Sequence, residues 1–121
     1  MALFTAAILL ILLGAIHSAL GEIRIFRLER SFQIARRTGL PVRQVRILRA
    51  TWQLATVFGW AFAGVLLFAA SSAAGSADLG FVRYAIGAAV LAGSAVVLIG
   101  TRGRHPGWFV LLAVGVLCWL G

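Results

Sequence analysis

The chain has 121 residues, of which 62% are hydrophobic and only 12% are charged. Charged residues make up about 25% of an ordinary soluble protein, so the composition excludes that class and indicates an integral membrane protein with several spans. The net charge of +8 comes from eleven Arg and no Lys against three acidic residues. Where these Arg lie along the chain therefore determines how it is oriented in the membrane.

The first apolar run, residues 2–20, has about the 20 residues that an α-helix needs to cross ~30 Å of hydrocarbon. We expect a transmembrane helix here and not a signal peptide, because no basic segment precedes the run and the positive charges follow it. Helices associate in lipid through close packing of small residues, since lipid tails are as apolar as Leu. Gly14 and Ser18 are therefore predicted to face a neighbouring helix.

An arginine-rich segment follows, from residue 22 to residue 49. It holds eight of the eleven Arg, and the positive-inside rule places it in the cytoplasm. Apolar residues recur at helical spacing at both of its ends. Between them, Gly39 and Pro41 stand in the order in which one helix ends and the next begins. We predict that the first two helices extend into a basic cytoplasmic helical hairpin.

Three further apolar segments follow the first span. They are residues 51–71, 79–100 and 106–120. Arg102 and Arg104, in the loop before the last of them, fall on the cytoplasmic side, and only Arg83 falls outside. The predicted fold class is therefore all-α: a single domain, residues 1–121, forming a four-transmembrane-helix bundle with both termini outside.

Small residues recur on the third span, and a tryptophan lies deep in the second. Ala85, Ala89 and Gly93 follow one another at four-residue spacing, which predicts a packing seam, either within the monomer or against another subunit. Trp60 lies ~12 Å along the helix from the membrane boundary at Trp52. Its indole N–H needs an acceptor there, and Thr56, one turn back, is available.

Polar side chains gather at the cytoplasmic ends of three predicted spans. They are His17, Ser18, Glu22, Arg49, Trp52, Gln53 and His105. Four interpretations are open. The cluster binds a metal or a haem through its imidazoles, it lines the mouth of a transporter or channel, it belongs to a site for anionic lipid, or Glu22 pairs with an Arg and the His residues are satisfied locally. No cofactor is assigned.

Arginine side chains beside an anionic leaflet attract its headgroups, at about 1 kcal/mol each before screening. Those predicted to bind anionic lipids are Arg24, Arg27, Arg43, Arg46, Arg102 and Arg104. Because membrane topology already explains the Arg run, we expect no nucleic-acid partner.

No nucleophile, base and orienting residue share one side of the membrane in a recognisable arrangement, so we expect no enzyme. The predicted function is structural or accessory, through association of the chain with itself or with a larger membrane complex. The alternatives are a small transporter or channel with a His/Glu-lined cytoplasmic mouth, and a metal- or haem-binding membrane subunit.

Three short motifs resemble those of a group of small bacterial four-helix inner-membrane proteins to which no activity is assigned. The motifs are HSALGE at residues 17–22, LRATWQ at residues 48–53 leading to Trp60, and HPGW at residues 105–108. The resemblance implies an integral protein of the bacterial inner membrane. Gln53 departs from it, because a His is expected after the Trp of the second motif. This departure removes a third imidazole and weakens the metal interpretation.

Overall fold

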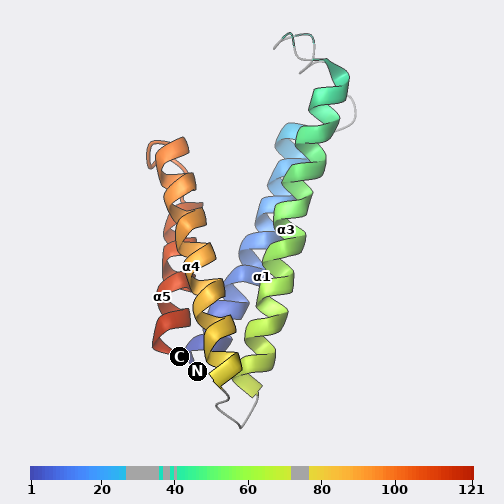
Figure 1. The fold of residues 1–121 in the computed structure, drawn as a ribbon. Coiled ribbons are helices and arrows are strands. Elements are labelled where there is room, and N and C mark those ends of the chain that lie inside the picture. Colours follow the sequence, from blue (N-terminus) through green and yellow to red (C-terminus); the bar gives the residue numbers. More distant parts are fainter. Residues whose placement is uncertain (27–35, 37–38, 40, 72–76) are drawn as a thin grey trace. The chain divides into compact units, whose positions relative to one another are not determined.

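The structure is a computed structural model that describes residues 1–26, 36, 39, 41–71 and 77–121. Every regular element within these residues is helical, which confirms the all-α prediction for the described part of the chain. The elements are α1 (Ala2–Leu20), a π-helical segment that continues it (Gly21–Phe26), α3 (Val42–Ser71), α4 (Ala77–Gly100) and α5 (Gly107–Leu120), as Figure 1 shows.

Three helical stretches of the described chain are long and apolar enough to cross a membrane. They are Ala2–Phe26, Val42–Ser71 and Leu79–Gly100. Helix α5 has 14 residues, which at 1.5 Å per residue extend about 21 Å. This is less than the ~30 Å of a typical hydrocarbon core. The residues predicted as a fourth span therefore form a shorter apolar helix than the other three.

Helix α3 begins well before the predicted second span. Its first turn follows Pro41, whose carbonyl oxygen accepts hydrogen bonds from the backbone N–H groups of Gln44 and Val45, at 2.8 and 3.3 Å. Proline suits this position because its fixed φ matches a helix and it has no N–H to leave unpaired. The basic residues at the start of α3 are thus held on the same helix as the apolar residues 51–71. The predicted hairpin tip and Arg27 lie outside the described residues.

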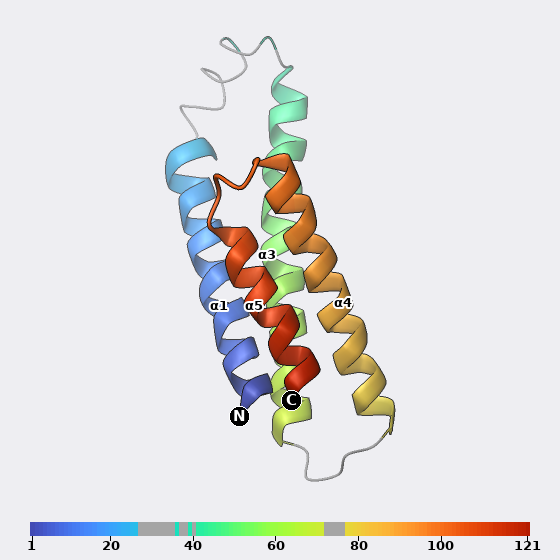
Figure 2. The same ribbon diagram turned by 90° about the vertical axis from the view of Figure 1, so that its left-hand side faces the viewer.

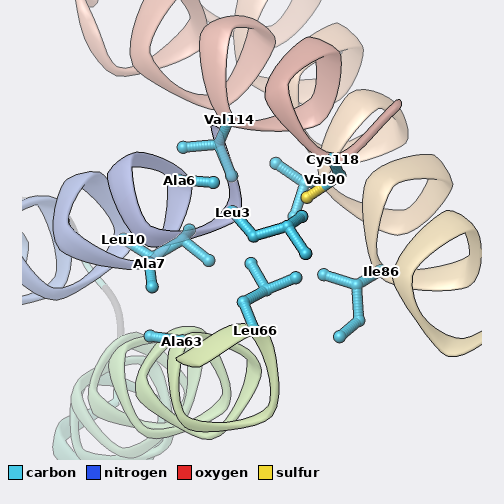
Figure 3. Close-up of a cluster of buried hydrophobic side chains, with 10 residues drawn as sticks. All are labelled: Leu3, Ala6, Ala7, Leu10, Ala63, Leu66, Ile86, Val90, Val114 and Cys118. Atoms are coloured by element: carbon cyan, nitrogen blue, oxygen red, sulfur yellow. The ribbon is translucent and has the colours of Figure 1, made fainter. Parts of the chain in front are cut away.

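The described chain forms two compact units. One comprises Met1–Leu13 and Trp60–Gly121, and the other comprises Gly14–Gly59. A buried apolar cluster forms the core of the first unit, where side chains from all four α-helices of the described chain point toward one another (Figure 3). Its members are Leu3, Ala6, Ala7, Leu10, Ala63, Leu66, Ile86, Val90, Val114 and Cys118.

Helices α4 and α5 lie side by side in the first unit (Figure 2), and glycines allow their close contact. A Cβ atom on Gly115 would lie 2.5 Å from Cγ of Leu91, and one on Gly87 would lie 2.9 Å from Nε1 of Trp119. The hydroxyl of Ser94 donates a hydrogen bond to the carbonyl oxygen of Trp108 at 2.7 Å. Small residues and one buried hydroxyl thus join the two helices, as expected for helices in lipid.

This seam lies on a different face of α4 from the one predicted. Ala85 and Ala89 are exposed, and a Cβ atom on Gly93 would meet no atom within 4 Å. Four-residue spacing marks a face of small residues but does not tell which face a neighbouring helix covers. A role for these three residues in contact with another subunit stays a prediction.

The turn after α4 has an unusual backbone at Arg102. The N–H of Gly103 donates to the carbonyl oxygen of Leu98 at 2.8 Å, and the N–H of Arg102 donates to that of Ile99 at 3.1 Å. This is the paired pattern of a Schellman helix end, in which the first residue past the helix is left-handed. Arg102 takes that position with φ of 51°, where Gly is the usual residue.

Candidate functional site

Two polar pairs join α1 and its π-helical continuation to α3 within the second unit. The hydroxyl of Ser18 donates a hydrogen bond to Oε1 of Gln53 at 2.5 Å. Arg49 donates from Nε to Oε2 of Glu22 at 3.2 Å, and from Nη2 to Oε1 of the same carboxylate. Glu22 follows Ser18 by four residues, and its partner Arg49 precedes Gln53, the partner of Ser18, by four residues. Both pairs therefore fit one antiparallel register of the two helical stretches.

The side chain of Trp52 is enclosed by residues of the opposite helix. Its ring stacks on that of His17, with centroids 4.2 Å apart and planes 7° from parallel, and meets the ring of Phe26 edge-on at 5.7 Å. Its Nε1–H donates to the carbonyl oxygen of His17 at 3.1 Å. A Cβ atom on Gly21 would lie 2.7 Å from Cδ1 of this indole. Only a glycine leaves room for the ring at this distance.

The π-helical segment explains how Phe26 reaches Trp52. Its hydrogen bonds join residues five apart, whereas those of an α-helix join residues four apart. Residues at i and i+5, such as Gly21 and Phe26, therefore lie closer to one face than they would in an α-helix. Both are buried. The wider turn lets one continuous stretch present His17, Gly21 and Phe26 to the same indole.

The Glu22–Arg49 pair is held by two hydrogen bonds at partial exposure. Both side chains are 38% exposed, so water screens the attraction and the pair contributes modestly to stability, as exposed ion pairs do. The two-point geometry nevertheless fixes the orientation of both groups. Both carboxylate oxygens of Glu22 accept hydrogen bonds, which is the arrangement of a structural link and leaves this carboxylate poorly placed to act as a base.

His105 belongs to the first unit, so the seven predicted cluster residues divide between the two units. Its side chain is exposed, and its Nδ1 accepts a hydrogen bond from the backbone N–H of Gly107 at 3.0 Å. A neutral imidazole that accepts at Nδ1 carries its proton on Nε2. His105 therefore caps the first turn of α5. Within the described residues, no group of three or more His, Cys, Asp or Glu side chains is arranged to hold a metal ion.

The arginines predicted to bind lipid are exposed where the structure describes them. They are Arg24, Arg43, Arg46, Arg102 and Arg104. None of the last four forms an ion pair with another residue in the described part of the chain. Their charge is therefore available to an anionic partner, whereas the charge of Arg49 is matched by Glu22.

Sequence reasoning missed two residues of this site and misplaced one hydrogen bond. Gly21 and Phe26 were not singled out, although a small residue such as Gly on a helix face lets a neighbouring helix approach closely. The indole N–H of Trp60 donates to the carbonyl oxygen of Ile11 at 3.2 Å, so the prediction of Thr56 as its acceptor is wrong. The Thr56 hydroxyl is buried and has no hydrogen-bond partner among the described residues.

Comparison with known proteins assigns no family to the chain. No family model, curated protein or solved structure matches it. The function proposed below therefore rests on the residues of the chain itself.

Proposed function

We propose that this chain is a structural or accessory protein of the bacterial inner membrane. In this proposal its helices form a four-helix bundle in the bilayer with both termini outside. The protein has no enzymatic activity. It acts by associating with itself or with a larger membrane complex, and its basic cytoplasmic side is seated on anionic lipids.

The observation that carries the proposal is the mutual satisfaction of the polar residues between α1 and α3. Glu22 is matched by Arg49, Ser18 by Gln53, and the Trp52 N–H by the backbone of α1. A site built for catalysis or transport holds reactive groups open toward a ligand, as strained or unmatched polar groups. Here the same groups lock two helices in register, which is what a structural element requires. This pairing gives no support to the channel alternative, in which Glu22 lines a mouth.

Exposed apolar surface supports a membrane environment. Large apolar side chains are more than half exposed on each α-helix of the described chain: Ile16, Phe58, Phe81, Ile99 and Phe109. Contiguous surface of this kind drives aggregation in water, whereas lipid tails match it. Together with three helices of spanning length, this supports insertion in a bilayer.

Association is supported by the exposed small-residue face of α4. Ala85 and Ala89 are exposed, and Gly93 faces open space in the described chain. Small residues let two helices approach closely in lipid, where no hydrophobic effect drives them together. A face of this kind that the chain does not use for its own packing is suited to a helix of a second copy.

Co-isolation of two differently tagged copies from the native membrane tests the proposal. Copies of the unaltered chain should isolate together, and Ala85→Leu with Ala89→Leu should reduce the shared yield several-fold by keeping the helices apart. Ala61→Leu, at an exposed position of α3, is the matched control and should change nothing. Copies that isolate singly, without any other membrane protein and without anionic lipid, would refute the proposal.

A further inference from the structure

The exposed face of α3 combines two features that normally occur in one phospholipid molecule. Arg43 and Arg46 lie three residues apart near the start of the helix, and both are exposed. Residues three apart in a helix are neighbours on its surface. Neither forms an ion pair with a described residue. The two guanidinium groups thus offer adjacent positive charge and several hydrogen-bond donors that suit a phosphate group.

An apolar stripe continues the same face toward the middle of the helix. Ile47, Leu54, Val57 and Phe58 are each about half exposed, and their spacing places them on the side that carries Arg43. The stripe is on the opposite side from Val45 and Thr56, which are buried. The stretch from residue 47 to residue 58 extends about 16 Å along the helix axis. The part beyond the membrane boundary predicted at Trp52, from Leu54 to Phe58, lies in the first ~9 Å of the cytoplasmic leaflet, and Ile47 lies on the headgroup side of that boundary.

Arg49 does not belong to this face. Glu22 accepts hydrogen bonds from two of its nitrogen atoms, so its charge is largely neutralised and directed at the neighbouring segment. Arg49 is therefore paired and joins two helices, whereas Arg43 and Arg46, one to two turns further out, form no ion pair with a described residue. A basic end followed by an apolar stripe repeats the order of headgroup and acyl chains in an anionic lipid and is complementary to it in charge and polarity.

We infer that one anionic diacyl phospholipid of the cytoplasmic leaflet binds along this face of α3. Its phosphate contacts Arg43 and Arg46, its glycerol ester region lies at Ile47, and its acyl chains lie on Leu54, Val57 and Phe58. The inference rests on the proposed membrane insertion and deepens it, because it assigns the binding site for anionic lipid to one face of α3 and not to the basic residues in general.

The full chain is reconstituted in vesicles that contain a spin-labelled lipid. Electron spin resonance then measures how strongly the protein associates with labelled phosphatidylglycerol compared with labelled phosphatidylcholine. Each Arg beside an anionic leaflet accounts for about a fivefold factor in association before screening. The unaltered protein should prefer phosphatidylglycerol several-fold, and the double variant Arg43→Gln with Arg46→Gln should lose that preference. Arg43→Lys with Arg46→Lys should keep most of it, because the charge remains.

The matched control is the double variant Arg36→Gln with Arg37→Gln, which removes the same charge from two arginines outside the predicted lipid-binding set and should keep the preference. Inorganic phosphate, compared with chloride at equal ionic strength, should not displace the labelled lipid. If both double variants lose the preference equally, or if inorganic phosphate abolishes it, the inference is overturned while the proposed function stands. If the unaltered protein shows no preference for phosphatidylglycerol, both the proposed association with anionic lipids and the inference of a site on α3 are wrong.

Discussion

The indole of Trp52 lies where a side chain on Gly21 would begin. A Cβ atom there would be 2.7 Å from Cδ1 and 2.8 Å from Cε2 of the ring, well inside van der Waals contact. The ring cannot move away easily, because His17 stacks on it and its N–H donates to the backbone of α1. This contact therefore sets how closely α1 and α3 approach within the second unit.

Gly21→Ala should destabilise the protein by about 1–3 kcal/mol, as overpacking of a close contact does. The measurement is the free energy of unfolding in mixed micelles. Gly59→Ala is the control: its Cβ would meet no atom within 4 Å, so stability should be unchanged or rise by up to about 1 kcal/mol from better helix propensity. Equal effects of the two substitutions would show that the Trp52 contact does not restrict Gly21.

The Glu22–Arg49 ion pair should show a measurable but modest coupling. A double-mutant cycle with Glu22→Gln and Arg49→Gln should give about 0.5–1 kcal/mol, because both side chains are more than a third exposed and water screens them. The same cycle with Arg46→Gln in place of Arg49→Gln should give a value near zero. A coupling that is as large for Arg46 would mean that the charge of Glu22 acts on the whole basic face.

Gly115 should be intolerant of a side chain. Its Cβ would lie 2.5 Å from two atoms of Leu91 and 3.3 Å from the carbonyl oxygen of Gly87, so Gly115→Ala should push α5 away from α4 and destabilise by about 1–3 kcal/mol. Gly93→Ala, whose Cβ meets nothing within 4 Å, should leave the unfolding free energy of the monomer unchanged or raise it by up to about 1 kcal/mol from better helix propensity. A thermal melt in detergent that ranks these two variants in the reverse order would contradict the α4–α5 contact.

Arg102→Gly should stabilise the protein. Arg102 holds a left-handed backbone with φ of 51°, a conformation that Gly adopts at lower cost than residues with a Cβ atom. We expect a gain of about 0.5–1 kcal/mol in the free energy of unfolding. Arg102→Ala keeps the Cβ atom and should give no such gain. If both variants gained equally, loss of the charge and not relief of the backbone would be the cause.

Long apolar runs predicted the helices well because a continuous apolar run of about 20 residues is typical of one unbroken helix of spanning length. Helix α1 covers residues 2–20 and α4 covers residues 77–100, where the sequence predicts the first and third spans. The pairing of Glu22 with an arginine was one of the interpretations left open. Which arginine it takes depends on the register between α1 and α3, and periodicity within one helix does not specify it.

The contacts around Trp52 and between α4 and α5 could not be predicted from the sequence, because they also depend on how two helices meet and not on the pattern within one helix. The π-helical segment at Gly21–Phe26 differs from an α-helix by one residue per hydrogen bond, a change that no composition or period reveals. The acceptor of Trp60 is a backbone carbonyl of another helix, and every residue type offers one. Ala85, Ala89 and Gly93 resemble Gly87 and Gly115 in size, so small residues alone do not show which face packs within the chain.

Native mass spectrometry of the protein, released gently from its own membrane, tests whether it acts by association. We expect an assembly larger than one chain that retains anionic phospholipid. A bare monomer without lipid, or a monomer that carries a metal ion or a small solute, would contradict a structural role through association and would favour a site for that ligand instead.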